Sequence, residues 1–102
     1  KRERDLRIEN DRSAAIAQIE VLKAMIEKLE TRSMLNSISV RSEIESILWF
    51  PSSVLREIEF VHSHTVHHHA LIAEKLLGFG IHVEGDFGVA PSTLQYWKKQ
   101  AA

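Results

Sequence analysis

The sequence predicts a mainly helical protein in which a short β element separates two long helices. Two observations predict this fold class. Apolar residues recur every three or four positions along two stretches of the chain, and polar and apolar residues alternate along the segment between them. A chain of 102 residues is long enough for one domain and little more, so we expect residues 1–102 to form a single domain.

The first predicted helix extends from about position 11 to position 32, a region without Gly or Pro. Its apolar positions recur every three or four residues and therefore share one face: Ala15, Ile19, Leu22, Ile26 and Leu29. Asn10 or Asp11 is available as the N-cap of this helix. The charged segment before it is expected to be a solvated lead-in.

In the segment from Asn36 to Phe50, several apolar residues occupy even positions and several polar residues occupy odd ones: Ile38, Val40, Ile44, Leu48 and Phe50 against Ser39, Arg41, Glu43 and Glu45. Such alternation is typical of a strand and indicates a small hairpin that turns near Ser42. Pro51 follows, and because proline is favoured in the first turn of a helix, we expect it to begin the next one.

The second long helix is predicted from the apolar positions between Val54 and Leu76, and Gly78 and Gly80 suit its C-terminus. The remaining residues are expected to form an ordered tail that packs back on the helices through its large apolar side chains: Phe87, Leu94, Tyr96 and Trp97.

Two amphipathic helices leave part of each apolar face without cover, and packing of four helices is the usual remedy. Either further helices precede Lys1 in the native protein, or two chains pair to complete a bundle. We favour the missing N-terminal helices, and also expect a homo-oligomer, most simply a dimer.

Composition excludes several classes of function. The chain carries 13 Lys and Arg against 14 Asp and Glu, a net charge of −1, which argues against nucleic-acid binding. No apolar run approaches the roughly 18 residues of a membrane span, so no membrane partner is expected. The absence of cysteine excludes disulfides and Cys-type zinc sites, and we expect a cytoplasmic location.

Five of the six histidines lie between positions 62 and 69, on the second long helix. At 100° per residue, His64 and His68 lie one turn apart on the apolar face, where we expect them to point at the core. Two histidines four residues apart can both bind one divalent metal ion, zinc or nickel being the metals that favour imidazole. The alternative is that they are hydrogen-bonded structural residues.

Two ligands do not make a tight metal site, because a catalytic zinc usually has three protein ligands and a water molecule. A third ligand within this chain would have to be His82 or a carboxylate such as Glu57 or Asp86. Glu57 is seven residues from His64, about 10 Å along a straight helix, and therefore too distant. The source of the third ligand is left open by the residues themselves.

The segment VHSHTVHHHALIAEKLLGFGI, preceded by Arg56–Phe60 and followed by DFGVAPSTLQYW, resembles the C-terminal portion of the DinB-like proteins. The resemblance covers most of the chain. It implies a four-helix bundle, here partial, with a three-histidine divalent-metal site in which His64 and His68 are two ligands. The third histidine of that family lies on a first helix upstream of this sequence, so the resemblance also implies that this chain lacks its N-terminal helix or helices.

The first functional hypothesis is a metal-dependent thiol transferase or hydrolase, because the DinB-like resemblance implies thiol cofactors such as mycothiol or bacillithiol. A three-histidine ion with open positions can bind water or a thiolate and lower its pKa. Catalytic residues and the small-molecule substrate are not identified. The second hypothesis is a non-catalytic helical module that pairs with itself or with another protein. A metal store or sensor is a third.

Overall fold

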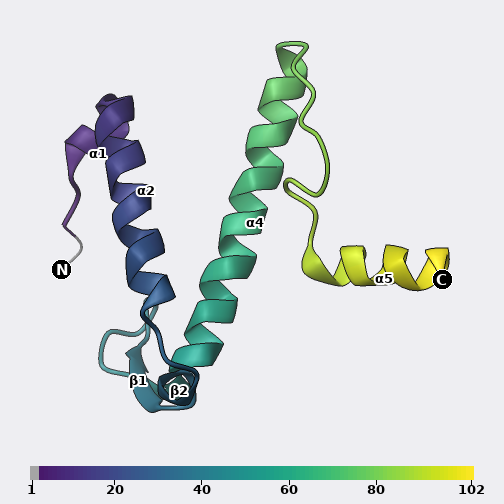
Figure 1. Cartoon of the computed structure of the whole chain (residues 1–102). Helices are drawn as coiled ribbons and strands as arrows, with labels where there is room; N and C mark the ends of the chain where they lie inside the picture. Colours follow the sequence, from purple (N-terminus) through teal and green to yellow (C-terminus); the bar gives the residue numbers. More distant parts are fainter. Residues whose placement is uncertain (1–2) are drawn as a thin grey trace. The chain divides into compact units, whose positions relative to one another are not determined.

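The computed structural model describes residues 3–102, in which helices and a two-stranded antiparallel sheet follow one another along the chain (Figure 1). Helices account for 61% of the described residues, which confirms the prediction of a mainly helical protein; a four-helix bundle is not confirmed. The elements are α1 (Leu6–Asn10), α2 (Arg12–Glu27), α3 (Thr31–Met34), β1 (Ser37–Arg41), β2 (Trp49–Ser53), α4 (Val54–Gly78) and α5 (Pro91–Ala101).

The chain divides into two compact units, residues 1–36 and residues 37–102. The first contains α1, α2 and α3, and the second contains the hairpin, α4 and α5. Each unit is described by itself. The expectation of a single domain over residues 1–102 stays a prediction.

In the first unit, Asp11 caps α2, its carboxylate accepting hydrogen bonds from the backbone N–H groups of Ser13 and Ala14 at 2.9 and 3.3 Å. The sequence predicted this helix and gave Asp11 as one of two candidate caps, but the helix ends at Glu27 instead of near position 32, so Leu29 lies outside it. The sequence did not predict α1, which lies in the segment expected to be a lead-in. Asp5 caps α1, and hydrogen bonds from the side chain and backbone of Arg7 lower the pKa of the Asp5 carboxyl.

The second unit begins with a hairpin, as predicted, but residues 42–48 form its connecting loop, so Ile44 and Leu48 of the predicted alternation are not strand residues. β1 pairs with β2 in a register that extends from Ser37 opposite Ser53 to Arg41 opposite Trp49. The turn begins at Ser42, whose hydroxyl accepts hydrogen bonds from two backbone N–H groups of the loop. Pro51 lies within β2 opposite Ser39, so the expectation that it begins a helix was wrong. In a sheet of two strands both strands are edges, where proline is tolerated.

Helix α4 begins one residue after Ser53, whose hydroxyl accepts a hydrogen bond from the N–H of Arg56 at 3.1 Å. It continues for 25 residues to Gly78, in agreement with the predicted end. Gly80 follows with a φ of 76°, a left-handed conformation that favours glycine. The serine cap therefore replaces the proline that was expected to start this helix.

The expected tail contains a further helix, α5, with Pro91 in its first turn. Phe87 and Leu94 are partly covered, but Tyr96 and Trp97 are 59% and 52% exposed and do not pack back as expected. No side chain of the described residues, apolar or polar, is buried. The described part of the chain therefore has no closed hydrophobic core.

Candidate functional site

The long helix α4 presents two different faces within the second unit. One is partly covered by the segment that follows the helix. The ring of His69 stacks on that of Phe87, with 4.4 Å between centroids and 15° between planes. The half-buried residues of the helix C-terminal to position 65 lie on this side: Val66, His69, Ala73 and Leu76.

The other face of α4 carries the two histidines singled out from the sequence. We call it the α4 strip and define it by six residues that lie within 120° on the helical wheel: Phe60, Val61, His64, His68, Leu71 and Ile72. All six are exposed, with 54% of Phe60, 60% of Val61, 42% of Leu71 and 45% of Ile72 accessible. His64 and His68 share the predicted face, but they do not point into a core.

The rings of His64 and His68 contact each other directly. Their Nε2 atoms are 3.1 Å apart, a hydrogen bond in which one ring donates and the other accepts. The two ring planes are 78° apart, with centroids separated by 4.7 Å. The ring of Phe60 lies 6.0 Å from that of His64 at an interplanar angle of 16°. The pair is thus satisfied as a hydrogen-bonded pair, which was the structural alternative.

The described residues contain no group of three or more His, Cys, Asp or Glu side chains that could hold a metal ion. The prediction that this is a metal-binding protein is therefore wrong for this part of the chain. His64 and His68 as two ligands are not tested by this result, and the choice of zinc or nickel and the thiol cofactor stay predictions. The thiol-transferase or hydrolase activity is likewise untested.

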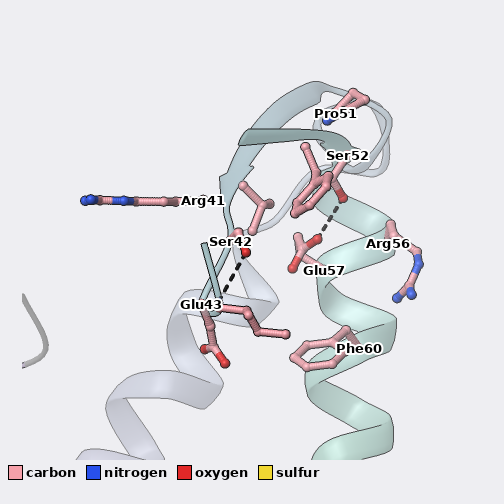
Figure 2. Close-up of a pocket in the computed structure, with 11 residues that line it drawn as sticks. Arg41, Ser42, Glu43, Pro51, Ser52, Arg56, Glu57 and Phe60 are labelled. Carbon is pink, nitrogen blue, oxygen red and sulfur yellow. Dashed lines mark hydrogen bonds between the residues drawn. The ribbon is translucent and has the colours of Figure 1, made fainter. Parts of the chain in front are cut away.

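A groove that sequence reasoning missed lies where the hairpin meets the first turns of α4 (Figure 2). Its volume is about 560 Å³, and apolar side chains of β1, the turn and β2 form much of its wall together with Phe60. Glu57 is half-buried there, and one of its carboxylate oxygens accepts a hydrogen bond from the hydroxyl of Ser52 at 2.7 Å (Figure 2). No sequence motif marked this groove, because the hairpin creates it.

Among residues 3–102, no helix is both long enough and apolar enough to cross a lipid bilayer.

The chain is similar to a curated protein named FK506-binding protein 5, from Rhizopus delemar. The two are 36% identical over 104 residues, which cover 98% of this chain and 27% of the relative. The chain therefore spans about a quarter of the length of the relative that it matches. No protein-family profile matches the chain, and no solved structure matches it. The resemblance to DinB-like proteins was wrong, because the relative that matches nearly the whole chain is named as an FK506-binding protein and no DinB-like protein profile matches.

Proposed function

We propose that this chain is a non-catalytic helical module that associates with a second copy of itself through the α4 strip. The single observation that carries the proposal is the row of apolar and aromatic side chains on α4 that the rest of residues 37–102 leaves exposed, with only Phe60 beside the hairpin groove. Exposed apolar rows of this kind, flanked by polar residues, mark surfaces for protein association.

The energetics of the second unit support this proposal. Ordering a residue costs about 1–2 kcal/mol of backbone entropy, which folded domains offset mainly by burying apolar surface. A unit of residues 37–102 without a buried side chain lacks that compensation. Subunits of obligate dimers obtain it from the interface, and their folding and association then occur together.

A second copy fits the strip better than nucleic acid does. The net charge of −1 supplies little attraction for a polyanion, and the strip itself carries aromatic, aliphatic and imidazole groups rather than Lys or Arg. Two copies also supply four long helices, α2 and α4 from each, which is the number a four-helix bundle requires. We place this module in the cytoplasm, where a chain without cysteine loses no stabilising disulfide.

The similarity to FK506-binding protein 5 concerns about a quarter of that protein. FK506 binding is not part of the function proposed for this chain.

The test compares two leucines of the same helix. Leu71 lies on the strip and is 42% exposed, whereas Leu77 lies about 120° away and is 55% exposed. Leu71→Gln removes apolar surface from both sides of the dimer and is expected to raise the dissociation constant about tenfold or more. Leu77→Gln, the matched control, should leave it within about threefold. Sedimentation velocity over a concentration series measures both.

Equal dissociation constants for the two variants would contradict the assignment of the strip. A wild-type chain that stays monomeric at every concentration would contradict self-association itself.

A further inference from the structure

Two oppositely charged residues lie at the two ends of the α4 strip. Glu57 and Lys75 are 18 residues apart, which is five whole helical turns, so they lie on one line about 27 Å apart along the strip. Neither forms a salt bridge with any of the described residues. Glu57 retains one carboxylate oxygen beyond that bonded to Ser52. One end of the strip therefore carries a carboxylate that is half-buried beside the hairpin and hydrogen-bonded to Ser52, and the other end carries a cation without a salt bridge among the described residues.

The residues between these charges are arranged symmetrically about position 66. Phe60 and Val61 lie as far before this position as Leu71 and Ile72 lie after it. The same midpoint relates His64 to His68, and Glu57 to Lys75. A surface with this arrangement is complementary to its own copy when that copy is turned end over end.

From this symmetry we infer that two copies of α4 pair antiparallel through the strip, about a twofold axis level with position 66. The inference rests on the function proposed above and specifies its register. Phe60 and Val61 of one copy then lie at the level of Leu71 and Ile72 of the other, and the histidine pairs of the two copies meet at the centre. Each Glu57 faces Lys75 of the second copy.

The charges decide between the two directions of pairing. A parallel pair in register would place Glu57 against Glu57 and Lys75 against Lys75, so both ends would be repulsive. The antiparallel pair converts both ends into attractive pairs. The opposite face of α4 is not free for such pairing, because Phe87 stacks on His69 there. Glu57 and Lys75 therefore specify the direction in which the two helices pair, and the stack of Phe87 on His69 specifies which face of α4 is available.

The first experiment uses cysteine crosslinking, which has no background because the chain contains no cysteine. Val61→Cys and Ile72→Cys are made in separate chains of different size, one carrying a tag. Antiparallel pairing at an interaxial distance of about 9 Å brings these two positions within disulfide reach. In a pair formed by two Val61→Cys chains, the two cysteines lie about 15 Å apart along the helix axis, which is beyond disulfide reach.

The inference predicts that mild oxidation of the mixture gives the mixed-size dimer, whereas Val61→Cys alone stays uncrosslinked. Crosslinking of Val61→Cys to itself, with no mixed-size product, would show parallel pairing and overturn the inference while leaving self-association intact. No crosslink in any sample of a chain that sediments as a dimer would mean that another surface is used. A monomeric wild type would instead reject the proposed function as well.

The second experiment reverses one charge. Lys75→Glu replaces both attractive end pairs by repulsive ones in the antiparallel dimer and should weaken it about three- to tenfold. In a parallel dimer the same change exchanges one repulsive pair for another and leaves the affinity unchanged. Combining Lys75→Glu with Glu57→Lys restores the attractive pairs only in the antiparallel arrangement. Failure of the double variant to regain affinity would count against the register.

Discussion

The two faces of α4 carry similar residues, but the segment that follows the helix covers only one of them. Around His69 the segment after the helix returns, so that Phe87 stacks on the imidazole ring. On the other side, His64 and His68 hydrogen-bond to each other within an apolar row that stays exposed. Both faces have apolar and histidine residues at helical spacing. Sequence periodicity therefore identifies a face, whereas only the path of the chain determines whether that face is covered.

The largest expected effect on the covered face comes from Gly88→Ala. Gly88 has a φ of 77°, and a Cβ atom added there would lie 2.8 Å from the backbone N and Cα of Ala70. Left-handed strain and a clash with helix backbone act together, so we expect a loss of about 2–4 kcal/mol in the free energy of unfolding. Chemical denaturation measures it.

Gly85→Ala is the matched control for that loss. Gly85 also has a positive φ, 67°, but no atom lies within 4 Å of the added Cβ. The backbone strain alone should cost about 1–2 kcal/mol. Equal losses for the two glycine variants would mean that close packing of this segment on α4 does not contribute to stability.

A smaller effect is expected from Phe87→Ala, which removes the stacked ring but leaves the backbone unchanged. We expect a loss of about 1.5–3 kcal/mol in the free energy of unfolding, from the aromatic pair and the apolar area together. Phe79→Ala is the control, because that ring is 82% exposed and its removal should cost less than about 0.5 kcal/mol. If both variants unfold at the same denaturant concentration, the covered face is not held by this stack.

The smallest expected effect on stability comes from a change at the N-terminus of α4, a part of the helix common to both faces. Ser53→Ala removes the acceptor of the Arg56 N–H and should cost about 1 kcal/mol of stability. Ser63→Ala, on the same helix but away from its ends, should change stability by less than about 0.5 kcal/mol. A Ser53 variant as stable as the Ser63 variant would show that the cap is dispensable.

Much of the local structure could be predicted because its causes are local. Spacing and capping groups located α2 and α4, and alternation located the hairpin. Pro51 was misplaced because its preference for a first helical turn competes with its tolerance at a strand edge, and Ser53 supplies the cap instead. Helix α5 was missed although Pro91 in its first turn was a usable signal.

The candidate site was only partly predictable. Helical geometry correctly placed His64 and His68 on the same face, and the structure brings their Nε2 atoms together. The same geometry could not show that the two side chains are exposed, because exposure depends on residues distant in sequence. The expected metal-binding group and DinB-like relationship were wrong because a two-histidine spacing and short similar segments are shared by unrelated helices. The groove beside Glu57 arises from tertiary contacts and had no local signal.

The central claim is that the exposed strip of α4 associates with a second copy, and the molar mass of the unaltered chain tests it most directly. Sedimentation equilibrium at neutral pH, over concentrations from low to high micromolar, should show a shift from 11.7 kDa toward twice that mass. A mass that stays at 11.7 kDa throughout this range, in a chain that circular dichroism shows to be helical, would contradict the account.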